Sequence, residues 1–422
     1  MLCMFSKAFP RPHCQVPLTD NPAGGKLARQ SPANATAAFT MVEILVATAV
    51  LIVLLVLSAQ IIDRTGRVWT DASSKMEQFR EARIGFDALI EHLNKATLGQ
   101  YYGYTYRTVA STLVQSGTMQ VPYYFGRRSE LRFICGPGAM EAQTSATSPC
   151  PTDSVFFTAP LGITSSGSYA RLPGLLNMCG YFVQWSNVDP ELPSILNGHT
   201  VNGTTLSGST GIYRFRLMQF VQPAENMTLY SQTAASYVKT NPTYTFVYAP
   251  QWPITAMGNS PASVRPVANN VVALLLLPAM STTDTSGSLV TTSGTLGWTY
   301  DSQVAAQGGK AALENPATIN PATSAFNRLP PVIRVVLYTI DEASAKKAVS
   351  IQNMPGCLYQ YQSIQLFQNP AILYPTMSGT TVTDVGDLAR FESVLVQNKL
   401  TFRRFEAAVQ LPPQPWSTLP DF

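Results

Sequence analysis

The chain has 422 residues, of which 45% are hydrophobic and 12% are charged, and its formal net charge is +4 at pH 7. Residues 1–38 carry a net +3 of this charge, which leaves +1 for the rest and excludes nucleic acid as an expected partner. Serine, threonine, glycine, proline and aromatic residues are plentiful, which favours a strand-and-loop domain over a helical one. The roughly 320 residues from Gly99 onward can bury a sizeable core.

A long apolar segment near the N-terminus contains a single acid. Residues 44–57 carry no charge and one hydroxyl, Thr48, and residues 39–62 supply about 20 apolar positions, the length that crosses a bilayer as a helix. We therefore expect a transmembrane helix over residues 39–62. Glu43 lies at the start of this segment, and carboxylates inside a membrane are usually paired or functional. The neighbouring sequence supplies no such partner.

The stretch that begins at Phe39, reading Phe-Thr-Met-Val-Glu-Ile-Leu-Val-Ala, resembles the processing and methylation motif of the type IV pilins and of the pseudopilins of type II secretion. In that family prepilin peptidase cuts before the Phe and methylates the new amine. The resemblance implies a leader peptide at residues 1–38, cleavage between Ala38 and Phe39, and pairing of Glu43 with the N-terminal amine of a neighbouring subunit. The leader departs from the family pattern, since Ala38 stands where Gly is usual and the nearest upstream basic residue, Arg29, is distant.

The same resemblance implies partners and a location. The expected partners are prepilin peptidase, other pilins or pseudopilins and the inner-membrane assembly platform. The chain would cross the inner membrane once, with its C-terminal head in the periplasm. Two alternatives remain open: the apolar segment is a secretory signal peptide cut after Ala59, or it is a plain membrane anchor in which Glu43 is incidental.

Residues 63–98 continue with helical periodicity and charged residues between the apolar ones, which predicts an amphipathic helix. Gly66 lies near the junction with the apolar segment, where it would allow a bend. The apolar residues that recur at three- and four-residue steps are Trp69, Ala72, Met76, Phe79, Phe86, Ile90 and Leu93.

Residues 99–422, here called the head, alternate between short strand-like runs and turn residues, which predicts a mainly antiparallel sheet and an α+β fold. Residues 281–327, rich in Thr, Ser, Gly and Ala, are expected to form an elaborated loop or mobile insertion. A helix is expected near residues 384–397. The expected strands lie at residues 131–134, 154–157, 181–185, 212–217, 270–277, 329–342 and 401–411.

Two later segments extend the resemblance. Residues 79–86, on the amphipathic helix, and the Leu-Pro-Pro-Val-Ile-Arg-Val run that begins at Leu329 look like the J-type minor pseudopilin of type II secretion. The size of the chain and residues 340–345 look more like a prepilin-type family of Verrucomicrobia known as cassette protein C. Neither family is known as an enzyme, so the resemblance implies no catalytic activity.

Four cysteines lie outside the leader: Cys135, Cys150, Cys179 and Cys357. An even number of cysteines in an oxidising compartment predicts up to two disulfides, among three connectivities, or buried thiols. No pair has the spacing of a zinc knuckle, so a zinc site is not expected.

Motifs for catalysis or for a cofactor are absent from the sequence. His92 and His199 are the histidines outside the leader, and they form no metal-binding or hydrolase pattern. Asp341 with Glu342, and Asp384 with Asp387, offer carboxylates for a calcium ion, although the dense acidic loop of a dedicated site is missing, and solvated turn acids are the simpler interpretation.

Two classes of function follow from these observations. The first is a structural subunit, a minor pilin or pseudopilin that enters a short inner-membrane filament. The second is a membrane-anchored extracytoplasmic binding protein that joins no filament.

Overall fold

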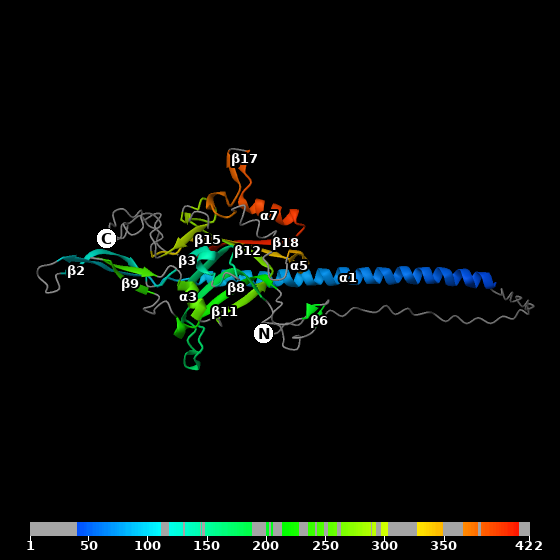
Figure 1. Cartoon of the computed structure of the whole chain (residues 1–422), viewed down its shortest axis with the longest axis horizontal. Coiled ribbons are helices and arrows are strands. Elements are labelled where there is room, and N and C mark those ends of the chain that lie inside the picture. The colour runs from blue at the N-terminus through cyan, green and yellow to red at the C-terminus, as the bar shows by residue number, and fades with distance from the viewer. Residues whose placement is uncertain are drawn as a thin grey trace, which may run out of the picture. The chain divides into compact units, whose positions relative to one another are not determined.

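The computed structural model has an α+β fold, in which one long apolar N-terminal helix packs against a mostly antiparallel β-structure (Figure 1). The chain divides into two compact units, Met1–Gly66 and Arg67–Phe422. The structure describes residues 40–110, 118–129, 131–143, 145, 148–187, 200–201, 204–205, 213–227, 235–240, 243–248, 252–259, 263–287, 289–292, 297–302, 327–348, 366–378 and 381–412.

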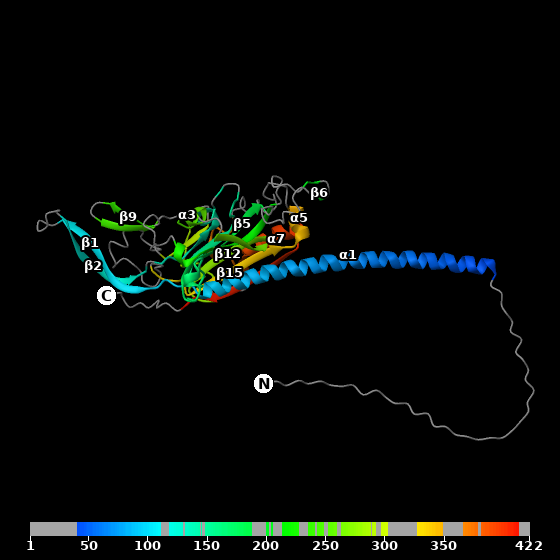
Figure 2. The ribbon, with the colours of Figure 1, turned by 90° about the horizontal axis from the view of Figure 1, so that it is seen from below.

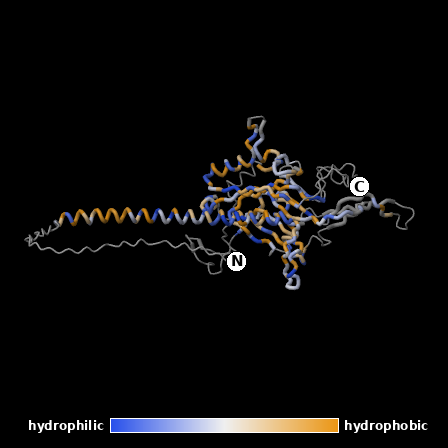
Figure 3. Tube along the Cα trace, turned by 180° about the vertical axis from the view of Figure 1, so that it is seen from behind, coloured by the Kyte–Doolittle hydropathy of each residue, from blue (hydrophilic) through white to orange (hydrophobic). Residues whose placement is uncertain are grey.

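Helix α1 spans Met41–Asn94 without a break, so the two helical segments expected from the sequence are one 54-residue helix that ends at Asn94 rather than at residue 98. Thr40 holds its first turn, because the Thr40 hydroxyl oxygen accepts a hydrogen bond from the backbone N–H of Glu43 at 3.3 Å. Figure 3 shows the apolar first half of α1 giving way to alternating polar and apolar residues. Gly66 lies inside the helix and does not interrupt it.

The other helices among the described residues are short. They are α2 (Gly138–Glu141), α3 (Trp252–Asn259), α5 (Glu342–Ala348) and α7 (Asp387–Gln397), with 3-10 turns η1 (Gly167–Tyr169), η4 (Ala224–Asn226) and η8 (Pro370–Ile372). The strands are β1 (Tyr101–Ala110), β2 (Thr118–Arg128), β3 (Ile134–Pro137), β4 (Asp153–Pro160), β5 (Leu176–Asn187), β6 (Thr200–Val201), β7 (Thr204–Thr205), β8 (Tyr213–Gln222), β9 (Ala235–Thr240), β10 (Thr243–Tyr248), β11 (Val264–Asn269), β12 (Val271–Ala279), β13 (Thr291–Thr292), β14 (Trp298–Asp301), β15 (Val332–Ile340), β16 (Thr376–Ser378), β17 (Thr381–Asp384) and β18 (Phe402–Gln410).

Two sheets build the core of the head, and among the described strands every pairing in them is antiparallel. The larger sheet has seven strands in the order β11-β8-β5-β4-β3-β14-β13, and the smaller has the order β12-β15-β18. Every residue of β12 is buried. A strand covered on both faces needs an unbroken apolar run, which explains why the sequence from Val271 to Leu277 does not alternate with polar residues.

Strand β12 pairs with β15 along one edge, and side chains from the larger sheet occupy its other edge. The Leu274 N–H donates to Thr152 Oγ1 at 3.1 Å, and the Leu276 N–H donates to Asp153 Oδ2 at 2.9 Å. The Leu276 carbonyl accepts from Trp298 Nε1 at 2.9 Å. Backbone groups buried away from water need such partners, so these side chains join the two sheets without a strand-to-strand ladder.

The second half of α1 packs on both sheets through its apolar face (Figure 2). The ring of Phe86 lies 5.8 Å from the ring of Phe405 on β18. The helix comes still closer to the head at Gly85. A Cβ atom at this position would lie only 3.2 Å from Val267 and 3.3 Å from Leu217. Glycine at this position therefore allows the close approach of helix and sheet.

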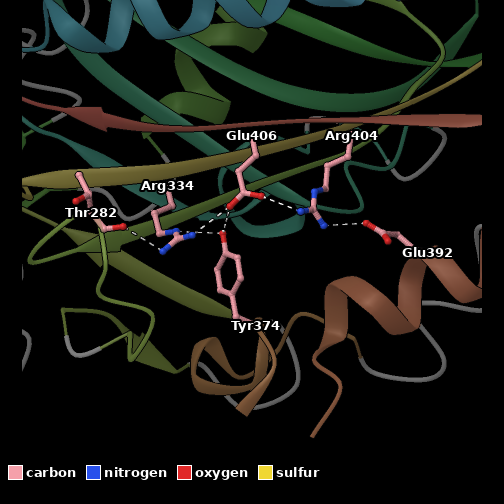
Figure 4. Close-up of polar contacts among 6 residues, drawn as sticks. All are labelled: Thr282, Arg334, Tyr374, Glu392, Arg404 and Glu406. Atoms are coloured by element: carbon pink, nitrogen blue, oxygen red, sulfur yellow. Dashed lines mark hydrogen bonds and ion pairs between the residues drawn. The ribbon is translucent and has the colours of Figure 1, made fainter. Parts of the chain in front are cut away.

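Helix α7 covers the other face of the smaller sheet, with Tyr338 and Phe391 in edge-to-face contact at 5.1 Å. Figure 4 shows a line of alternating charges formed by Arg334, Glu406, Arg404 and Glu392. Arg334 donates to Glu406 at 3.1 Å, and Arg404 bridges Glu406 at 3.1 Å and Glu392 of α7 at 2.9 Å. Partly exposed pairs of this kind contribute little stability singly, so their main effect is to orient α7 on the sheet.

Most expected strands are confirmed, but the expected loop at residues 281–327 is wrong at two places. Strands β13 and β14 form within it, and β14 pairs with β3 through Tyr300↔Cys135. The alternation of Trp298 and Tyr300, both buried, with Thr299 is a strand signal that the surrounding Thr and Gly residues obscure. The expected strand at residues 131–134 is also displaced, because β3 begins only at Ile134.

Candidate functional site

The start of α1 is the candidate site. In the described part of the chain, α1 is the one helix long and apolar enough to cross a membrane, judged by length and composition. Glu43 is its first-turn acid, and no charged residue follows it before Asp63. Ala38 and Phe39, the expected processing site, lie outside the described residues.

Glu43 carries its carboxyl group in the first turn of α1. Its backbone N–H is already satisfied by Thr40, whose carbonyl accepts it at 3.0 Å. Within the described residues, no cation lies in ion-pair distance of its carboxylate, and the neighbouring side chains Met41, Val42 and Ile44 are apolar and exposed. A carboxylate in such surroundings favours a cation supplied from outside the helix, because burial in lipid without one is costly.

Polar contacts fix the second half of α1 to the head. Lys75 pairs with Asp341 at 3.2 Å, and the Gln78 amide oxygen accepts from the Glu342 N–H at 2.6 Å. Glu81 accepts from the backbone and side-chain amides of Asn269, both at 3.1 Å. Helix and head are thus joined by specific hydrogen bonds in addition to apolar packing.

The acids considered for calcium bind side chains and backbone of the chain itself. Asp341 is 1% exposed and Asp387 is 2% exposed, so the expectation of solvated turn acids is wrong for both. Burial raises the pKa of Asp341, but hydrogen bonds from Ser344 and the Lys75 ammonium outweigh it and lower that pKa. Asp387 bonds to Arg390 at 2.9 Å and accepts from the Phe367 N–H at 2.9 Å.

The two remaining acids also have cationic partners. Glu342 pairs with Arg214 at 2.7 Å, and Asp384 pairs with Arg390 at 2.8 Å. Across the described residues, no group of three or more His, Cys, Asp or Glu side chains is placed to hold a metal ion.

The three described cysteines, Cys135, Cys150 and Cys179, are free and buried, so no disulfide joins them. Burial raises the pKa of each thiol, which keeps it protonated and unreactive. Their role is that of small apolar core residues, one of the two expectations from the sequence. Cys357 and His199 lie outside the described residues.

The sequence did not predict a buried charge cluster beside β3. Arg132 and Asp301 form a two-point ion pair, with Arg132 Nε 3.0 Å from Asp301 Oδ1, and both side chains are at least nine-tenths buried. Glu141 at the end of α2 is 5% exposed, and its Oε2 atom has no hydrogen-bond partner. Burial raises the pKa of Glu141 to about 7. The one sequence signal was a charged residue, Arg132, between apolar neighbours.

The described residues thus contain one candidate membrane-spanning helix that carries a single acid, Glu43, in its first turn. Comparison of the chain with protein-family models, with curated proteins and with solved structures finds no match.

Proposed function

We propose that the chain is a structural subunit, similar to a minor pilin or pseudopilin, that is processed by prepilin peptidase and enters a filament in the inner membrane. One observation carries the proposal: a single uninterrupted helix holds Glu43 in its first turn, continues through an apolar stretch without further charge, and docks its second half on a β-rich head. The order of residues after Ala38, which resembles the prepilin motif, gives Glu43 the fifth position of the processed chain.

Glu43 would serve such a subunit by fixing the axial register between neighbouring helices. Cleavage before Phe39 would create a new amine four residues from Glu43, on the same end of the helix. A neighbour's amine and this carboxylate would neutralise each other inside the membrane, whereas either charge alone would be costly there. Buried ion pairs add little net stability but penalise every misaligned arrangement, so the pair would select one axial stagger between neighbouring helices.

The test compares two single-acid variants by in-membrane crosslinking between copies of the chain and partner subunits. Glu43→Ala should be inserted and processed, because removing an acid eases membrane burial, yet its crosslinking should be lost. Glu77→Ala is the matched control, because Glu77 is an exposed acid on the same helix outside the apolar stretch; it should crosslink like the unmodified chain. Undiminished crosslinking of Glu43→Ala would contradict the pairing of Glu43 with a neighbour's amine, and an unmodified chain that forms no crosslinks would support an anchored binding protein that joins no filament.

Mass spectrometry of the membrane-extracted protein tests the processing step separately. The N-terminal residue should be a methylated Phe39. Substitution of Ala38 by Leu should leave the precursor uncut, since the peptidase must fit a small side chain there, and Ala38→Gly should be cut at least as well. An intact leader, or an N-terminus after Ala59, would contradict the processing proposal.

A further inference from the structure

His92, in the last turn of α1, makes the closest polar contact between this end of the helix and the larger sheet. Its Nδ1 atom lies 2.7 Å from the Tyr181 hydroxyl oxygen of β5 and 3.2 Å from the Gln219 amide nitrogen of β8. The Cys179 sulfur lies 3.7 Å from the same nitrogen. The imidazole therefore sits at the junction of three elements, and it is only half-buried.

The hydrogen bonds around His92 define which atom donates. Arg265 Nε donates to Gln219 Oε1 at 3.0 Å, which turns the Gln219 amide nitrogen toward Tyr181 and His92. That nitrogen donates to the Tyr181 hydroxyl oxygen at 2.6 Å. With this bond accepted, the Tyr181 proton is satisfied when it is donated to Nδ1 of a neutral imidazole. The contact consequently needs a neutral imidazole with a lone pair on Nδ1.

Protonation of Nδ1 reverses this arrangement. An N–H at Nδ1 would face the donor amide of Gln219, and the Tyr181 proton would lose its acceptor. A buried hydroxyl that lacks an acceptor destabilises a contact, and so do two N–H donors that face each other. The Tyr181 oxygen already accepts from Gln219, so it could accept from an Nδ1–H only by turning its own proton away from its acceptor.

The charges that face His92 also oppose protonation. Burial is the largest cause that lowers the pKa of His92, followed by the Lys95 ammonium, and the Arg265 guanidinium adds to the effect. Glu91 acts in the opposite direction, but it is exposed and already bonded to Lys95 at 2.6 Å.

From the strand side, Cys179 and Tyr181 face the imidazole. Burial raises the pKa of both, so they stay neutral while His92 titrates. Gln219 has no ionisable group.

We propose that His92 makes the docking of the last turn of α1 on the head pH-sensitive: the neutral imidazole anchors this turn to Tyr181 and Gln219, and its protonation releases the anchor. Because the folded state binds the proton less readily than the unfolded state, the anchor is complete above the ordinary histidine pKa of about 6.5 and is lost as pH falls through the lower folded value. The inference goes beyond the proposed function and does not depend on the partner of Glu43.

Hydrogen exchange of the full-length protein in detergent tests the proposal. The quantity compared is the protection factor of the backbone amides of residues 89–94, corrected for the intrinsic pH dependence of exchange, at about pH 7.5 and about pH 5. We expect at least a fivefold loss of protection at the lower pH, with the amides of β15 as the internal reference. His92→Gln, which keeps an acceptor and cannot titrate, should lose less than twofold.

A second measurement keeps the proposal testable if His92→Gln fails to fold. NMR titration of the His92 imidazole should give a midpoint below the ordinary value, and Tyr181→Phe, which removes the donor to Nδ1, should raise that midpoint. A midpoint in the unmodified protein at or above about 6.5, or an equal loss of protection in His92→Gln, would overturn the proposal.

Discussion

Glu141 offers a direct test of how burial of a charge controls the stability of the head. It is 5% exposed, Oε2 lacks a hydrogen-bond partner, and the nearby Arg132 is already engaged by Asp301. Burial is the main cause that raises its pKa from 4.5 to about 7; the Arg132 charge lowers it and the Asp301 charge raises it. The folded protein therefore holds a proton that the unfolded chain releases.

The sign and size of the effect follow from this difference. Between the unfolded pKa of 4.5 and the folded value of about 7, the folded state binds more protons, so stability falls as pH rises. At about 1.4 kcal/mol for each pH unit, the full loss is about 3 kcal/mol, and most of it falls between pH 5 and pH 8.5. Glu141→Gln resembles the protonated carboxyl in shape and does not titrate, so this loss should be absent in the variant.

The assay is urea unfolding of the detergent-solubilised protein at the two pH values, followed through the fluorescence of the buried Trp185 and Trp298. Other titrating groups, such as Asp153, affect both proteins equally, so the comparison isolates Glu141. The advantage of Glu141→Gln over the unmodified chain should be about 2 to 3 kcal/mol larger at the higher pH. Glu77→Gln, at an exposed position, is the control and should show no such change. An advantage that is equal at both pH values would refute the reasoning.

Two further predictions concern the packing of the head and its ability to fold without the apolar first half of α1. Phe391→Ala removes a ring whose centroid lies 5.1 Å from that of Tyr338 and 5.6 Å from that of Phe367. This substitution should lower the free energy of unfolding, measured in urea, by about 3 to 5 kcal/mol. Phe391→Leu should lower it by less. A chain that starts at Asp63 should be soluble and give a sheet-dominated circular dichroism spectrum, because residues from Arg67 onward form one compact unit; a helix-dominated spectrum would contradict this.

Local patterns made much of the fold predictable. The apolar run of β12, the helical period of α7 and the alternation in β18 each lie within one short segment, so the sequence carried them directly. Glu43 could be recognised from the sequence for the same reason, because the apolar residues that set it apart follow it directly in the chain. Segments in which one strand signal is surrounded by Thr, Ser and Gly, such as β14, were not predictable in this way.

The polar contacts that depend on distant partners were not predictable. Asp341 looked like a turn acid because Lys75, which neutralises it, lies on a helix far away in the sequence. Arg132 and Asp301 are 169 residues apart, and only the register of β3 and β14 brings them together. The sequence alone does not show which distant residue will lie beside a charged side chain. A buried, paired charge in an apolar run therefore looks the same in the sequence as an exposed one.

The side chains that occupy the second edge of β12 also limit how copies of the chain can associate. An open strand edge invites pairing with another strand, a hazard that grows where subunits are held at high local concentration. Thr152, Asp153 and Trp298 already use the Leu274 and Leu276 backbone groups, so no foreign strand can extend the smaller sheet on that side. Copies of the chain that were brought together would therefore meet through folded surfaces rather than by strand exchange at this edge.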